Sequence, residues 1–180
     1  MSFDSISKIL KKVDAENKPF WQIILEDDMN ERKVSSKESI DKMAFLYNSM
    51  KKADASYDGN LKSASGLVGG EGEKIKVALE KGTLMCGNFI GTVMERALKM
   101  GESNACMKRI VAAPTAGSCG VIPAVLLTYE EFFNVTEEKI LEALYVASGL
   151  GEVIALRASI AGATGGCQAE IGSASAMAAG

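Results

Sequence analysis

The stretch Ser35-Ser-Lys-Glu-Ser-Ile-Asp-Lys-Met-Ala-Phe-Leu-Tyr-Asn-Ser-Met50 points to the fold class. Ser35 and Glu38 have the spacing of a capping box, in which each side chain satisfies a backbone N–H group of the other residue. Apolar residues then recur at intervals of three and four, the pattern of one helix face: Ile40, Met43, Ala44, Tyr47 and Met50. This stretch therefore predicts an amphipathic helix.

The same helical pattern extends over most of the chain. Lys74 to Glu80 and Cys86 to Met100 read as helices, the second closed by Gly101, and Asn134 with Glu137 predicts the start of a further helix. Strand signals are few, because no alternating run exceeds a few residues. We expect a mainly α, all-helical single domain in which glycine-rich loops open buried helices.

Composition bounds the class of protein. The 180 residues are 47% hydrophobic with a formal charge of -3, which excludes a disordered chain and argues against a dedicated binder of nucleic acid or membrane. The chain has no histidine, so Ser-His-Asp catalysis, Cys-His catalysis and histidine-based zinc sites are excluded. There is no export signal or membrane span, and the four cysteines form no C-x-x-C pair. We expect a cytoplasmic protein without disulfides and with no nucleic-acid or membrane partner.

Charge is distributed unevenly along the chain. Residues 110–180 hold only nine charged side chains, and residues 1–109 hold 34. The first part is typical of solvated surface helices, and the second is typical of a buried core or an interface. Two interpretations of the second part stay open. It is either the core of one domain, or a surface that packs against protein outside this sequence.

One glycine-rich segment precedes an apolar helix: Ala113-Pro-Thr-Ala-Gly-Ser-Cys-Gly-Val-Ile-Pro123. Gly117 and Gly120 allow a tight turn, and Ser118 is a candidate helix cap. Thr115 and Ser118 add hydroxyl groups to the unpaired N–H groups of the helix start, which attracts a carboxylate or a phosphate. The alternative is an ordinary capped helix start, and the pattern is not that of a nucleotide-binding P-loop.

A second glycine-rich segment holds a single cysteine: Gly165-Gly-Cys-Gln-Ala-Glu-Ile-Gly172. Cys167 is expected near the start of a helix, where the positive end of the dipole favours the thiolate that binds iron or a soft metal. The alternative is a small buried cysteine in a tight helix contact. A third loop, Ser65-Gly-Leu-Val-Gly-Gly70, is either a flexible connection or the lining of a site.

These three segments together resemble signature stretches of the bacterial iron–sulfur-dependent L-serine dehydratases, in particular the alpha chain of the two-chain form. The resemblance runs from about Lys37 to Gly180, and the first 36 residues resemble the family only loosely. It implies a lyase, an L-serine ammonia-lyase, that converts L-serine to pyruvate and ammonia together with a beta chain. It also implies a [4Fe-4S] cluster held by three cysteines, with one iron open to activate the substrate hydroxyl as a Lewis acid.

The resemblance also assigns roles to residues of this chain. It makes Cys167 a cluster ligand, and it implies substrate binding by Thr115, Gly117, Ser118, Ser65 and Gly66. The family's other two ligands form a Cys-x10-Cys pair that would lie beyond Gly180. We therefore expect this chain to be the N-terminal part of a longer alpha chain, without an intact cluster and inactive alone. The catalytic base is unassigned, and Glu170 is a conceivable local substitute.

Two further expectations concern assembly and alternative functions. A face of small residues should be uncovered and favour a homo-oligomer: Ser173, Ala174, Met177 and Ala178. A non-catalytic helical module that binds a small carboxylate stays possible. A pyridoxal-phosphate dehydratase is disfavoured, because the basic residues cluster in the polar first part and leave no lysine in an apolar setting.

Overall fold

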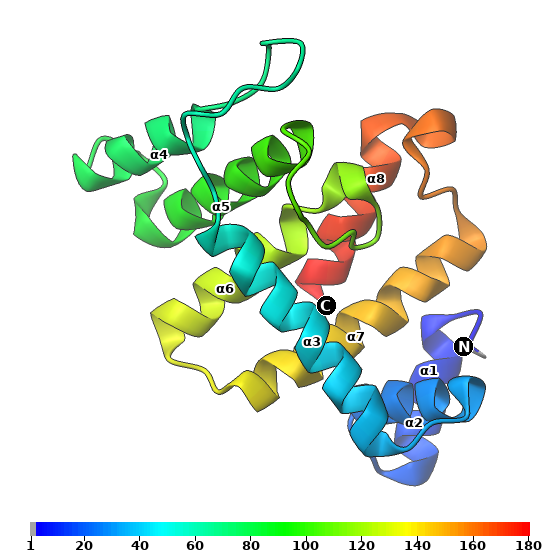
Figure 1. Ribbon diagram of the computed structural model, residues 1–180. Helices are drawn as coiled ribbons and strands as arrows, with labels where there is room; N and C mark the ends of the chain where they lie inside the picture. The colour runs from blue at the N-terminus through cyan, green and yellow to red at the C-terminus, as the bar shows by residue number, and fades with distance from the viewer. Residues whose placement is uncertain (1–2) are drawn as a thin grey trace. The chain divides into compact units, whose positions relative to one another are not determined.

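Figure 1 shows the computed structural model, which describes residues 3–180. Over this range the chain forms helices and no strand, which confirms the mainly α-helical prediction. The helices are α1 (Ile6–Glu16), α2 (Phe20–Arg32), α3 (Ser36–Ala55), α4 (Glu71–Glu80), α5 (Gly87–Ala105), the short 3-10 helix η1 (Ala116–Ser118), α6 (Val121–Phe133), α7 (Glu137–Arg157) and α8 (Gly162–Ala179). None of the helices in the described range has the length and apolar character needed to cross a membrane.

The chain divides into two compact units, and the boundary falls within α3. Unit 1 consists of residues 3–46 and Thr136–Gly180, and unit 2 consists of Tyr47–Val135. The division does not follow the uneven charge of the sequence, because α7, from the charge-poor part, packs on charge-rich α2 within unit 1. Helix α7 itself carries six of the nine charged side chains of residues 110–180, so the low charge of that part comes from its other segments.

Unit 1 is built around an apolar cluster from three helices. The buried members of the cluster are Phe3, Ile9, Ile23, Ile24, Leu25, Tyr145 and Val153. On the other side of α7, helix α8 folds back along α7, and a Cβ atom at Gly151 would lie only 2.6 Å from the Met177 side chain. Ser173, Ala174 and Met177 are buried as a result. Ala178, the fourth residue of the expected face, is half-buried, so the expectation that this face is uncovered is wrong, because α8 packs on α7 within the same chain.

One of the predicted helix ends, the side-chain cap at the start of α3, is found in the structure. In the predicted capping box, the Ser35 N–H donates to Glu38 Oε2 at 2.8 Å and the Glu38 N–H donates to Ser35 Oγ at 3.3 Å. Two predicted ends are wrong. Gly101 lies inside α5, and Asn134 ends α6 in the left-handed conformation with φ 49° instead of starting α7, whose N-cap is Thr136.

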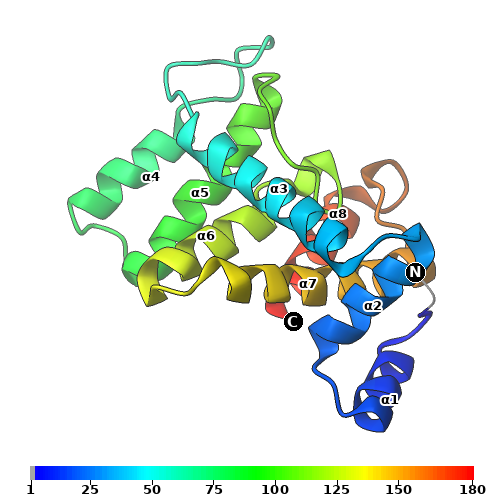
Figure 2. The ribbon, with the colours of Figure 1, turned by 60° about the horizontal axis from the view of Figure 1, so that its bottom comes forward.

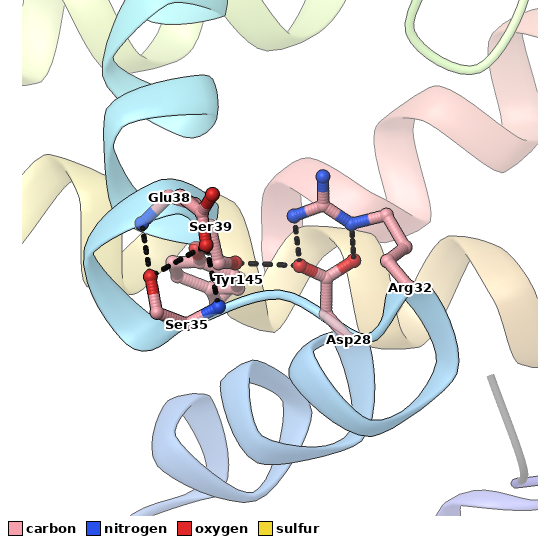
Figure 3. A network of polar contacts seen from close by, with 6 residues as sticks. All are labelled: Asp28, Arg32, Ser35, Glu38, Ser39 and Tyr145. Atoms are coloured by element: carbon pink, nitrogen blue, oxygen red, sulfur yellow. Dashed lines mark hydrogen bonds and ion pairs between the residues drawn. The ribbon is translucent and has the colours of Figure 1, made fainter.

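A partly buried polar network, with Ser39 and Tyr145 buried and Arg32 exposed, joins α2, α3 and α7 in unit 1 (Figure 3). Asp28 accepts hydrogen bonds from Arg32 Nε at 2.7 Å and from Ser39 Oγ at 2.5 Å, and Ser39 Oγ lies 2.6 Å from the Tyr145 hydroxyl. Burial acts to raise the pKa of Asp28, but the hydrogen bonds from Arg32 and Ser39 outweigh it and hold the pKa below its ordinary value. The ionised carboxylate therefore stabilises the folded unit.

In unit 2, α4 and α6 both pack on α5 (Figure 2). The start of α6 approaches α5 so closely that a Cβ atom at Gly120 would lie 2.5 Å from the Ala97 carbonyl oxygen. Gly120 itself has φ -82°, a conformation open to any residue. The predicted reason for this glycine, a tight turn, is therefore wrong, and the actual reason is backbone contact between two helices.

We predict that Gly120→Ala destabilises the chain by about 1–3 kcal/mol, because the added methyl group meets a backbone atom that cannot rotate away. Gly101→Ala is the matched control on α5. No atom lies within 4 Å of a Cβ built there, so the higher helix propensity of alanine should raise stability by up to about 1 kcal/mol. Urea denaturation followed by circular dichroism measures both changes. Equal effects of the two substitutions would contradict the close-contact explanation.

We also predict a pH-dependent effect of Asp28→Asn. A carboxylate with a lowered pKa contributes stability above its unfolded pKa, and this contribution is lost as the pH falls through the folded pKa. At pH 7 the variant should lose about 1.5–3 kcal/mol, and the stabilities of the two proteins should converge below about pH 4. The control is Asp41→Asn, whose side chain is 66% exposed and should have no measurable effect. A stability difference that stays constant down to pH 2 would contradict this account.

Candidate functional site

The segment between α5 and α6 forms a closed capping box in unit 2. The hydroxyl oxygens of Thr115 and Ser118 lie 3.0 Å apart, and the Thr115 N–H donates to Ser118 Oγ at 3.4 Å. Asn104 of α5 donates from Nδ2 to the Ala116 carbonyl at 3.0 Å and ties η1 to that helix. Ser118 is only 1% exposed, whereas Gly117 is exposed. The structure thus brings Thr115 and Ser118 together, but it turns the Ser118 hydroxyl inward.

Ser118 does not cap α6 as the sequence suggested. It is the last residue of η1, and the N-cap of α6 is Gly120. The next residue, Cys119, is buried, and its Sγ lies 3.7 Å from the Met100 carbonyl. Burial raises the pKa of the Cys119 thiol to about 11, so this sulfur is protonated at neutral pH and is a poor metal ligand.

The third glycine-rich loop is ordered by bonds within itself. The Ser63 N–H donates to the Val68 carbonyl at 2.9 Å, and the Ser65 hydroxyl lies 3.1 Å from the Ser63 hydroxyl. Gly66 has φ 74°, a left-handed conformation that favours glycine. Ser65 and Gly66 are exposed at the tip of this loop, although the Ser65 hydroxyl also accepts from the Leu67 N–H at 3.4 Å and the Gly66 N–H donates to the Ser63 carbonyl at 2.8 Å. The loop is therefore a defined structure with exposed small residues at its tip.

Glu102 of α5 holds the end of this loop. The residue is 4% exposed, and its carboxylate accepts hydrogen bonds from the Glu71 N–H at 2.5 Å, the Gly72 N–H at 3.2 Å and the Tyr57 hydroxyl at 2.5 Å. Gly70, the N-cap of α4, has no side chain, so Glu102 supplies the cap from a neighbouring helix. Burial and the hydrogen bond to Glu102 raise the pKa of Tyr57, which keeps its hydroxyl a donor. Sequence analysis missed Glu102, because no local pattern marks a cap supplied from another helix.

Cys167 lies at a break in α8 in unit 1. Gly166 has φ 67° and ψ -168°, so α8 consists of two helical pieces, and Cys167 begins the second piece. The predicted position at a helix start is therefore found, and the thiol is exposed rather than buried in a helix contact. Glu170, one turn further on, is half-buried, and a Cβ atom at Gly162 would lie 2.7 Å from its Oε2.

The cysteines of this chain do not form a three-thiolate site. Among residues 3–180 no group of three or more histidine, cysteine, aspartate or glutamate side chains is placed to hold a metal ion. Cys86 and Cys106 flank the 19-residue helix α5, which is about 28 Å long at 1.5 Å per residue, and Cys119 is buried. These four cysteines alone therefore do not fit a [4Fe-4S] cluster with three protein ligands.

Comparison with known proteins identifies the family. Residues 15–180 match the family model described as serine dehydratase alpha chain. The chain is 38% identical over 163 residues to the probable L-serine dehydratase, alpha chain, of Bacillus subtilis, covering 88% of this chain and 54% of that protein. It is 42% identical over 113 residues to the L-serine dehydratase, alpha chain, of Peptoniphilus asaccharolyticus, covering 63% of this chain and 39% of the relative.

A protein named L-serine dehydratase from Haemophilus influenzae is 48% identical over 84 residues, which cover 46% of this chain and 18% of the relative. The chain thus spans about half the length of the Bacillus subtilis protein and a smaller share of the other two. The family model nevertheless covers all three glycine-rich segments described above. This chain belongs to the serine dehydratase alpha chain family.

Proposed function

We propose that this chain forms part of an L-serine dehydratase, a lyase that converts L-serine to pyruvate and ammonia. The observation that carries the proposal is the family match over residues 15–180, which includes the segments at 65–70, 113–123 and 165–172. Two relatives are named as alpha chains, which supports a beta chain as the partner of this protein. We further propose a cytoplasmic location, in keeping with the sequence analysis.

Within this proposal, the segment from Thr115 to Gly120 holds the substrate carboxylate. Gly117 is exposed, so the backbone N–H groups at the start of η1 are accessible to a small anion, whereas the Ser118 N–H donates to the Thr115 side chain. The Ser118 hydroxyl has a structural role instead, because it is buried and bonded to Thr115. Ser65 and Gly66 lie at the exposed tip of a loop anchored by Glu102, and we assign them a contact with the polar groups of the substrate.

Cys167 is the thiol of this chain best placed to ligate iron. It is exposed and follows a glycine break at a helix start, so its sulfur is accessible to a metal ion. The family resemblance supports a [4Fe-4S] cluster, and Cys167 would supply one ligand to it. The other thiolates would come from outside these 180 residues, because Cys86, Cys106 and Cys119 do not combine with Cys167 into a site. We therefore propose that this chain alone lacks an intact cluster and serine dehydratase activity.

The expectation of a homo-oligomer has lost its basis. It rested on an uncovered face at Ser173, Ala174 and Met177, and α7 covers that face within the same chain. Glu170 remains a conceivable base, with no interaction that singles it out for that role.

The proposal is tested in the two-chain enzyme that contains this chain, purified without oxygen and assayed for pyruvate release from L-serine. Cys167→Ser should remove the bound iron and lower turnover more than about 100-fold, since changes next to metal ligands already cost about 10–100-fold. Cys86→Ser is the control, because Cys86 is also an exposed cysteine and its replacement should keep iron and turnover. Circular dichroism should show unchanged helices in both variants. Normal iron content and turnover in Cys167→Ser would overturn the ligand assignment, and absence of pyruvate from the wild-type complex would overturn the function.

A further inference from the structure

A pocket of about 250 Å³ lies between α2, α3 and α7 in unit 1, beside the Asp28 network. Its lining is polar at Asp28, Arg32, Ser39, Lys42, Tyr145 and Ser148, and apolar at Met43 and Leu46. All of these residues belong to one compact unit. The pocket is smaller than the 300–1,000 Å³ typical of sites for drug-sized ligands, so it suits a molecule of a few carbon atoms.

The charged side chains that line this pocket, Asp28, Arg32 and Lys42, carry a net charge of one positive unit, and Glu38 acts on Arg32 from outside the lining. Asp28 and Arg32 form an ion pair through Nε and Nη2 and neutralise each other. Lys42 makes no ion pair with any carboxylate in the described part of the chain. Its Nζ lies over the Phe45 ring, 5.4 Å from the ring centre, in a cation–π contact. A pocket with this net charge favours a ligand that carries a single negative charge.

The pocket also offers hydrogen-bond donors that the fold does not use. Figure 3 shows the third guanidinium nitrogen of Arg32 pointing away from Asp28, without a partner among the residues drawn. Ser148 makes no side-chain hydrogen bond within residues 3–180, unlike Ser39, whose hydroxyl is bonded to Asp28 and lies beside that of Tyr145. The Asp28 network is thus complete by itself. Arg32, Lys42 and Ser148 converge on the pocket with donor capacity left for an oxyanion.

We propose that this pocket binds a small monocarboxylate, with its carboxylate between Arg32, Lys42 and Ser148 and its short carbon chain against Met43 and Leu46. A carboxylate matches the single excess charge, and a short carbon chain matches the apolar wall. A phosphate brings more negative charge and no apolar group. The site shares no residue with the glycine-rich segments or Cys167, so it does not depend on the proposed function. A bound carboxylate would link three helices of unit 1 and stabilise that unit.

The proposal is tested with propionate as the probe and the 180-residue chain, by isothermal titration and by the shift in thermal unfolding. Propionate should bind saturably with a Kd in the millimolar range or below and raise the melting temperature. Propionamide, which has the same shape without the charge, should bind at least about tenfold more weakly. Inorganic phosphate should also bind more weakly than propionate. No saturable binding of propionate, or tighter binding of phosphate, would overturn the proposal.

Variants locate the binding. Lys42→Gln should weaken propionate binding at least about tenfold, and Ser148→Ala should weaken it several-fold. Lys37→Gln is the matched control, because Lys37 lies on the same helix, outside the pocket, with its side chain 88% exposed. Circular dichroism checks that each variant is folded. If Lys42→Gln does not fold, the propionate affinity of Ser148→Ala tests the assignment by itself. Unchanged affinity in both pocket variants, or an equal loss in Lys37→Gln, would overturn the assignment.

Discussion

The hydrogen bonds of the buried Glu102 carboxylate hold the start of α4 in unit 2, where the glycine-rich loop of residues 65–70 ends. Two backbone N–H groups, of Glu71 and Gly72, and the Tyr57 hydroxyl converge on this one side chain. A buried carboxylate is costly unless it is fully hydrogen-bonded, and here the start of α4 supplies what the charge needs. The same bonds fix the point at which the glycine-rich loop of residues 65–70 ends and α4 begins. Loop geometry and helix packing in this unit are therefore coupled through a single residue.

Close packing between helices is the second constraint, and it bears on several glycines that have ordinary helical conformations. Gly120 meets the Ala97 carbonyl, Gly149 meets the Ile24 side chain, and Gly151 meets the Met177 side chain. At Gly120 an added methyl group would meet a backbone atom that cannot rotate away, whereas at Gly149 and Gly151 it would require a neighbouring side chain to shift. The long charge-poor stretch of the sequence is consistent with this packing, because helices that approach so closely have little room for charged side chains.

Local patterns in the sequence predicted only some local features, because the helix end expected at Gly101, the helix start expected at Asn134 and the cap expected at Ser118 are not found. The Ser35–Glu38 capping box and the helix start at Cys167 are found in the structure, because both depend on neighbours along the chain. Features that depend on distant residues were not predictable in this way. The cover of α7 over Ser173 and Met177, and the cap that Glu102 supplies to α4, join residues that are 20 to 30 positions apart or more. The spacing of residues along the chain does not predict such contacts.

Residue-level hydrogen exchange in the wild-type chain and in Glu102→Ala tests most directly whether Glu102 holds the end of the glycine-rich loop of residues 65–70. The amide protons of Glu71 and Gly72 should be protected in the wild type, because Glu102 accepts their hydrogen bonds. In the variant these two amides should exchange at least about tenfold faster, while amides in the middle of α6 keep their protection. Unchanged exchange at Glu71 and Gly72 would show that Glu102 does not hold this loop.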